Sequence, residues 1–222
     1  MISEQDFLPK SLDECVISDI HSRDTLHHVV TNRTPFPAFG KCGILLHGPY
    51  GTGKTTTARL LPELMEQARG GSDADYRFHR CAQGTNGAVL MTTIQTATSF
   101  LTVNASGLHY TILDEVDNLT DAAQASLKAI MNSLHGVFIL TTNHLTAVDK
   151  GVVNRCHVIH MLAARPQDWL PLVSRVIKAY GSQVPPASSL IPVIEQCSGS
   201  ARDILCAAVS IAARSQDAGA AA

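Results

Sequence analysis

The sequence predicts an α/β fold with a parallel sheet, followed by a small helical domain. Five short apolar segments alternate with segments of helical periodicity up to residue 163, which is the pattern of a doubly wound parallel sheet. After residue 163 the strand pattern stops and three helical segments follow. A glycine-rich turn separates the first predicted strand from the next helix, as in many parallel α/β folds.

The composition indicates a chain with a substantial core. Of the 222 residues, 45% are hydrophobic and 16% are charged, against roughly 25% charged residues in ordinary soluble domains. The 17 Lys and Arg residues face 19 Asp and Glu residues, a net charge of −2. This balance excludes a nucleic-acid binder that relies on a basic excess, although a local basic patch is compatible with it.

The sequence predicts neither membrane contact nor a structural zinc site. No apolar run approaches the ~20 residues that a membrane helix needs, so we predict no membrane contact. None of the six cysteines forms a Cys-x-x-Cys pair, which argues against a structural zinc site. We interpret them as reduced thiols of a cytoplasmic protein, or of a nuclear protein in a eukaryote and a host-cytoplasmic protein in a virus.

The first half of the chain is predicted to hold two strands and three helices. Residues 42–47 form a short apolar run without alternation, as expected for a strand buried on both faces. A helix over 19–30 precedes it. A helix from 54 to 69 follows and ends at Gly70, because glycine breaks a helix. Residues 76–81 then form a strand and residues 88–101 a helix.

The second half completes the sheet and adds the helical domain. Strands are predicted at 110–114, 137–140 and 156–161. Asp121 opens a helix with apolar residues at helical spacing, namely Leu127, Ile130, Met131 and Leu134. Three further helices are predicted at 166–180, 186–196 and 201–214. We therefore predict an α/β domain over residues 1–163, a helical lid over residues 164–216 and a disordered tail over residues 217–222.

A complete phosphate-binding motif follows the first strand. It matches G-x-x-x-x-G-K-[ST] between a strand and a helix, with the residues Gly48, Pro49, Tyr50, Gly51, Thr52, Gly53, Lys54 and Thr55. The glycines let backbone N–H groups face the phosphates, and the helix N-terminus adds partial positive charge. Lys54 is expected to reach the β- and γ-phosphates and Thr55 to coordinate Mg²⁺. The motif, called the P-loop below, predicts ATP and Mg²⁺ as cofactors over the alternative of a chance glycine-rich turn.

Polar residues at the ends of two later strands extend this site. Asp114 ends one strand and is expected to hold Mg²⁺, usually through water. Glu115 follows it and can polarise an attacking water. An ordinary acidic strand end is the alternative for both, weakened by the P-loop. Asn143, just past the strand at 137–140, can orient the water, and a strand-ending turn explains it equally well.

In these motifs the chain resembles the AAA+ ATPases of the clamp-loader group, and it is similar to small subunits of replication factor C and their viral counterparts. The resemblance covers roughly residues 6–214. Its specific part lies in the helix that starts Asp121-Ala-Ala-Gln124 and in the step Asn154-Arg155-Cys156, which occur in clamp-loader order with the P-loop, Asp114-Glu115 and residues 138–143.

The resemblance implies a fold, an activity and further site residues. It implies a five-stranded P-loop AAA+ domain with a three-helix lid, hydrolysis of ATP, and Asn143 as sensor 1. Arg155 would be an arginine finger that reaches a neighbouring subunit's γ-phosphate. Arg202, in Gly199-Ser200-Ala201-Arg202, would be sensor 2, reaching the nucleotide of its own subunit. Without the resemblance, a solvated surface charge is the better interpretation of each arginine.

The same resemblance implies partners. These are an oligomer of about five subunits, homomeric or heteromeric, DNA in its centre and a sliding clamp. Arg77, Arg80 and Lys128 are candidate DNA contacts, with plain surface charge as the alternative. Residues 87–101 correspond to the clamp-facing side of the family, although core packing is the simpler explanation for most of their apolar side chains.

The sequence departs from the family in three places, and the last of them favours an alternative function. Leu8 precedes Pro9 where the family has Arg, Asn154 replaces a Ser, and the sequence ends after the predicted lid, so we expect no collar domain. The alternative is an ATP-switched recruitment protein, of helicase-loader or transposition-regulator type, that assembles on DNA or a protein without loading a clamp. A protein-remodelling ATPase would need an aromatic pore loop, which residues 84–87 do not offer.

Overall fold

The computed structural model describes residues 3–82, 87–133 and 135–220. Their contacts divide the chain into two compact units. The larger unit comprises Asp19–Gly48 and Lys54–Met161, and the smaller comprises the described parts of Met1–Ser18, Pro49–Gly53 and Leu162–Ala222. The P-loop therefore contributes residues to both units.

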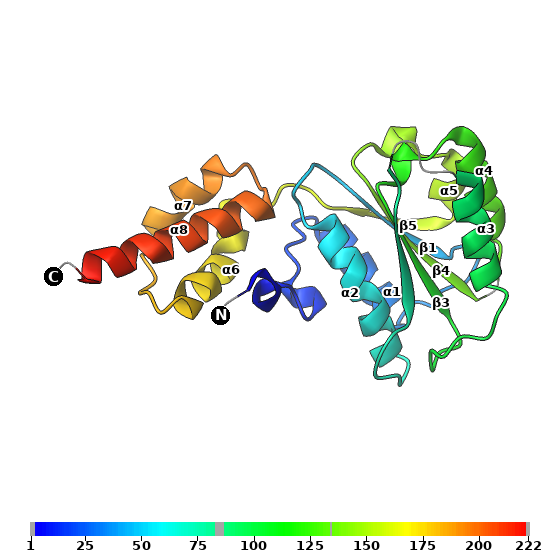
Figure 1. Cartoon of the computed structure of the whole chain (residues 1–222), viewed down its shortest axis with the longest axis horizontal. Coiled ribbons are helices and arrows are strands. Elements are labelled where there is room, and N and C mark those ends of the chain that lie inside the picture. Colours follow the sequence, from blue (N-terminus) through cyan, green and yellow to red (C-terminus); the bar gives the residue numbers. More distant parts are fainter. Residues whose placement is uncertain (1–2, 83–86, 134, 221–222) are drawn as a thin grey trace. The chain divides into compact units, whose positions relative to one another are not determined.

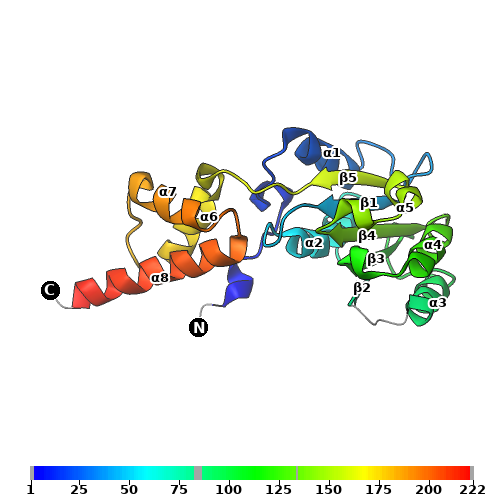
Figure 2. The same cartoon turned by 90° about the horizontal axis from the view of Figure 1, so that it is seen from above.

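The described residues of the larger unit form a five-stranded parallel sheet in the order β2-β3-β4-β1-β5 (Figures 1 and 2). The strands are β1 (Gly43–His47), β2 (Tyr76–Arg80), β3 (His109–Asp114), β4 (Gly136–Thr142) and β5 (Cys156–His160). This confirms the predicted sheet. The order places the carboxyl ends of β3, β4 and β1 side by side, and the P-loop follows directly after β1.

Helices cover both faces of this sheet. α1 (Ile20–Val30) and α2 (Lys54–Gln67) lie on one face, and α3 (Gly87–Ala97), α4 (Asp121–Ile130) and α5 (Lys150–Asn154) lie on the other (Figure 1). Every residue of β4 is buried, as expected for a central strand covered on both sides. One hydrophobic cluster joins the sheet to α3, α4 and α5, and includes Leu45, Ile94, Leu127, Phe138 and Val152.

The described residues of the smaller unit form a helical bundle with a short N-terminal segment. Helices α6 (Pro166–Ala179), α7 (Ala187–Gln196) and α8 (Ala201–Ala220) pack around a shared apolar core that includes Trp169, Val176 and Ile204. The N-terminal segment joins this unit, because Arg175 donates hydrogen bonds to the Glu14 carboxylate (2.8 Å) and to the Phe7 carbonyl (3.0 Å). The predicted α/β domain over residues 1–163 includes this segment.

The ends of three helices differ most from the prediction. Helix α3 ends at Ala97 rather than at residue 101. Helix α4 ends at Ile130, and the predicted Leu134 lies outside the described residues. Helix α8 extends to Ala220, and thus into the segment predicted as a tail.

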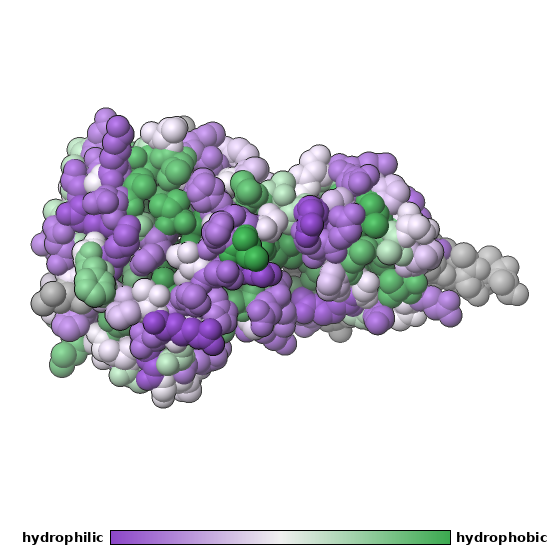
Figure 3. All heavy atoms as spheres, turned by 180° about the vertical axis from the view of Figure 1, so that it is seen from behind, coloured by the Kyte–Doolittle hydropathy of each residue, from purple (hydrophilic) through white to green (hydrophobic). Residues whose placement is uncertain are grey.

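The surface is mixed in character. On the face that Figure 3 draws, hydrophilic residues separate several groups of hydrophobic ones. Within the described residues, no helix is both long and apolar enough to cross a bilayer. Separate small apolar groups are normal on a protein surface.

Candidate functional site

The middle of the P-loop turns at two glycines. Gly51 and Gly53 have φ angles of +79° and +86°, in the region that only glycine adopts readily. A Cβ on Gly53 would meet no atom within 4 Å, so this part of the loop is open. A Cβ on Gly51 would lie 2.7 Å from Oγ of Ser200. The loop is therefore closely packed at Gly51 and open at Gly53.

The two ends of the P-loop are tied together within the larger unit. Lys54 begins α2, and its Nζ donates a hydrogen bond to the Gly48 carbonyl (2.8 Å). The Lys54 side chain is mostly buried, with 7% of the residue exposed. A Cβ at Gly48 would collide with the Met161 carbonyl oxygen, so glycine is required there. A buried ammonium at the first residue of a helix favours an anionic ligand.

One carboxylate oxygen connects three elements of the larger unit. Oδ1 of Asp114, at the end of β3, accepts hydrogen bonds from Oγ1 of Thr55 (2.7 Å) and from Oγ1 of Thr141 (2.7 Å). Asp114 is buried, with 6% of the residue exposed. The structure thus brings together the two residues that the sequence predicts for Mg²⁺. Carboxylate and hydroxyl oxygens are ligands that Mg²⁺ prefers.

Glu115 stands in a constrained backbone conformation beside this carboxylate. Its φ of 59° and ψ of 51° lie in the left-handed region, which costs a non-glycine residue about 1–3 kcal/mol and is frequent at functional sites. The Glu115 N–H donates to Oγ1 of Thr141 (2.9 Å). Its carboxylate forms an ion pair with Nε of Arg80 (3.4 Å). The Thr141 hydroxyl therefore fixes Asp114 and Glu115 together.

Asn143 lies at the same edge of the sheet. β4 ends at Thr142, which is in register with His47 at the end of β1. Asn143 is the next residue after β4, and Gly48 is the next residue after β1. The amide is therefore placed at the strand ends that carry the P-loop and Asp114.

The residues at this edge suit a nucleoside triphosphate with Mg²⁺. The buried Lys54 ammonium and the start of α2 provide donors that phosphates need. The oxygens of Thr55 and Asp114 lie within hydrogen-bond distance of one another and would hold the metal.

Arg155 lies at the carboxyl end of α5 and directly before β5, so it is not among the residues at the carboxyl ends of the strands. Its Nε and Nη2 both donate to Oδ1 of Asn132 (3.1 and 3.0 Å), and its Nη1 donates to the Gly151 carbonyl (3.0 Å). The Arg155 carbonyl accepts from the N–H groups of Cys42 and Gly43 (3.0 Å each). The backbone of Arg155 is therefore anchored to the start of β1.

Arg202 is the second residue of α8 and is exposed. The start of this helix contacts the P-loop segment of the same unit, because Ala201 N–H donates to the Gly51 carbonyl (2.9 Å). The helix that carries Arg202 therefore begins at the P-loop, through Ser200 and Ala201.

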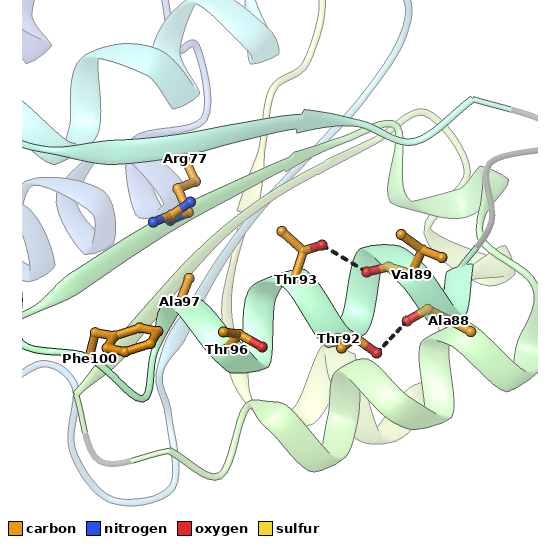
Figure 4. A pocket seen from close by; sticks show the side chains of 8 residues that line it. All are labelled: Arg77, Ala88, Val89, Thr92, Thr93, Thr96, Ala97 and Phe100. Carbon is orange, nitrogen blue, oxygen red and sulfur yellow. Dashed lines mark hydrogen bonds between the residues drawn. The ribbon is translucent and has the colours of Figure 1, made fainter.

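The three candidate DNA contacts have different surroundings. Arg80 pairs with Glu115, and Lys128 pairs with Asp149 (3.4 Å). Arg77 is part of the wall of a pocket of about 510 Å³, which α3 and Phe100 complete (Figure 4). The other residues that line the pocket are Ala88, Val89, Thr92, Thr93, Thr96 and Ala97.

The apolar residues of α3 mainly form core. Leu90, Met91 and Ile94 are buried, which confirms the core-packing interpretation for these three. Val89 is 61% exposed and faces the pocket of Figure 4. Residues 84–86 of the predicted pore-loop region lie outside the described residues.

Sequence reasoning missed the role of Thr141 and of Asn132. Thr141 belongs to the Thr-Thr-Asn run that ends β4, but only the sheet order places its hydroxyl beside Asp114. Asn132 lies 23 residues before Arg155, and no spacing rule connects the two. The one signal in the sequence is that Thr141 and Asn132 are polar residues near the end of an apolar strand or helix.

Comparisons with known proteins agree with this arrangement. Residues 44–163 match the family model described as "ATPase family associated with various cellular activities (AAA)". Replication factor C subunit 3 of Blastobotrys adeninivorans is 33% identical over 132 residues, which are 58% of this chain and 38% of that protein. The replication factor C small subunit of Picrophilus torridus is 31% identical over 171 residues, which are 73% and 48% of the two chains.

A solved structure supports the fold. The RuvB Holliday junction branch migration motor of Thermotoga maritima matches with a TM-score of 0.65 and 17% identity, over 90% of this chain and 63% of that chain. At this identity the match concerns the fold alone. This chain spans half or less of the length of the curated relatives that it matches.

Proposed function

We propose, since the chain belongs to the AAA family of ATPases, that it hydrolyses ATP in the presence of Mg²⁺ as a clamp-loader-type motor of DNA replication. The similarity to replication factor C small subunits supports the replication role. The single observation that carries the catalytic part is the hydrogen bond between Thr55 and Asp114 (2.7 Å), because it joins the P-loop to the end of β3.

The roles of the site residues follow from their chemistry. The P-loop N–H groups and Lys54 bind the phosphates, while Thr55 and Asp114 hold Mg²⁺, which neutralises phosphate charge when bound. Glu115 polarises the attacking water, and Asn143 orients it. Thr141 keeps Asp114 and Glu115 in a fixed relation.

Two arginines complete the proposed site. Arg202 stabilises the phosphates of its own subunit from the start of α8. Arg155 supplies positive charge to the γ-phosphate of a neighbouring subunit, since a planar guanidinium binds two phosphate oxygens at once. Hydrolysis then depends on assembly into an oligomer of about five subunits around DNA, with a sliding clamp as partner.

The catalytic assignment is tested by replacing Glu115. The variant Glu115→Gln should bind ATP with the affinity of the unaltered chain and lose at least 100-fold in turnover, since general-base catalysis contributes about 10²–10⁴-fold. The matched control is Glu63→Gln, which changes an exposed carboxylate of α2. Turnover near the normal rate in Glu115→Gln would remove Glu115 as the base.

A further inference from the structure

The side chain of Arg155 is held on two sides by groups of its own subunit. Oδ1 of Asn132 accepts from Nε and Nη2 (3.1 and 3.0 Å), and the Gly151 carbonyl accepts from Nη1 (3.0 Å). Asn132 lies two residues after α4, and Gly151 lies in α5. The guanidinium is thus fixed between two helices of the larger unit.

These bonds leave two N–H groups of the guanidinium available to an anion. Arginine has five N–H groups, and the hydrogen bonds found among the described residues use one on each nitrogen. One N–H on Nη1 and one on Nη2 are not used by these bonds. Two N–H groups on the terminal nitrogens match the spacing of two oxygens of a phosphate.

From this geometry we infer that Asn132 is the positioning residue of the arginine finger, so that Arg155 meets the γ-phosphate of the neighbouring subunit already oriented. The inference rests on the proposed function, in which Arg155 acts in trans. Asn132 acts through Arg155 and touches no nucleotide itself.

The chemistry of the acceptor suits this role. An amide oxygen orients the guanidinium without forming an ion pair, so the full charge of Arg155 stays available to the phosphate. Long arginine side chains lose rotamer freedom when they bind. Asn132 reduces this loss, because it restricts the side chain before assembly.

Oligomers that contain two different variants place the arginine finger and the hydrolysis site to be tested on different subunits. One subunit variant, called the acceptor below, is Arg155→Ala, which has an intact hydrolysis site and no finger. The other, called the donor, is Glu115→Gln, which has an intact finger and no base. Neither alone should turn over ATP, and mixing them should restore turnover at the acceptor sites if the finger acts in trans.

The donor then receives a second substitution, Asn132→Ala. We expect acceptor turnover to fall about threefold to tenfold, the range that corresponds to one net hydrogen bond, with the KM for ATP unchanged. A donor with Asn132→Asp keeps an acceptor oxygen at the same place but neutralises part of the charge, so its effect should be intermediate. Ser126→Ala, an exposed change on α4, is the matched control and should have no effect.

Each outcome separates the inference from the proposed function. If the Glu115→Gln donor restores turnover and the added Asn132→Ala changes nothing, the inference is wrong and the trans finger stands. If no donor restores turnover, the trans finger itself is wrong and the inference falls with it.

Discussion

The Asp114 carboxylate shows how single residues define the site. Its Oδ1 accepts two hydroxyl hydrogen bonds, which orient the carboxylate before any ligand binds. The Thr141 hydroxyl that donates one of them also accepts from the Glu115 N–H. The buried Thr141 side chain therefore helps to position both acidic residues.

Replacing Thr141 by Val tests this control. Valine has nearly the same shape but removes the hydroxyl, so Asp114 and Glu115 lose their common partner. We expect ATP turnover to fall about tenfold and stability to fall by about 1–2 kcal/mol, while ATP affinity changes little. Single-turnover kinetics and urea unfolding would measure both effects.

The adjacent residue provides the control. Thr142→Val removes a hydroxyl that accepts from His144 N–H and does not contact Asp114 in the described hydrogen bonds. It should leave the chemical step unchanged. Equal losses in the two variants would show that Thr141 acts through general stability alone.

At the scale of elements, the sequence predicted the sheet well and several helix ends poorly. Buried strands such as 42–47 are short apolar runs, so hydrophobicity alone identifies them. Helix ends depend on local contacts that hydrophobicity does not reveal, as the ends of α3 and α8 show. Helix α5 was missed because its five residues carry no periodicity, and it begins at the cap that Asp149 provides.

The residues of the candidate site could likewise be predicted only in part. The P-loop and Asp114-Glu115 are continuous motifs, so their residues could be named from the sequence. Thr141 could not be assigned, because its role arises from the order β3-β4 in the sheet. Asn132 could not be assigned either, because its contact with Arg155 joins the ends of two helices.

The contact between the P-loop and the start of α8 gives an element-scale prediction. Gly51→Ala should weaken ATP binding at least tenfold, because it places a Cβ against Ser200 in a backbone conformation that alanine avoids. Gly70→Ala is the matched control, since Gly70 has a similar φ of +88° with no atom within 4 Å. It should cost about 1 kcal/mol of stability and leave ATP affinity unchanged.

Titration calorimetry with ATP and thermal unfolding would separate the two variants. If Gly51→Ala binds ATP as Gly70→Ala does, the packing of the P-loop against Ser200 has no part in nucleotide binding.

At the scale of the whole molecule, partly buried histidines make stability depend on pH. Burial lowers the pKa values of His47, His79 and His157, with further lowering by nearby cations. The unfolded chain, in which histidine has a pKa of about 6.5, then binds protons more readily than the folded chain. Stability should therefore be fully present above pH 6.5 and should fall as the pH drops below it.

Urea unfolding followed by circular dichroism between pH 7.5 and 5.5 would measure this loss. His79→Gln should reduce the slope, because the substitution removes a group whose pKa is lowered in the folded chain and glutamine does not titrate. The control, His21→Gln, changes an exposed side chain and should leave the slope unchanged. A flat profile in the unaltered chain would contradict the effect.

The most direct test of the central claim is the ATP turnover of the purified chain, with and without primed-template DNA. A motor of DNA replication should hydrolyse ATP, and primed DNA should raise the rate severalfold by favouring assembled subunits in which Arg155 reaches a neighbouring site. The same stimulation should be absent in Arg155→Ala, with ATP binding retained. Turnover that DNA does not change would contradict the account of a DNA-engaged motor.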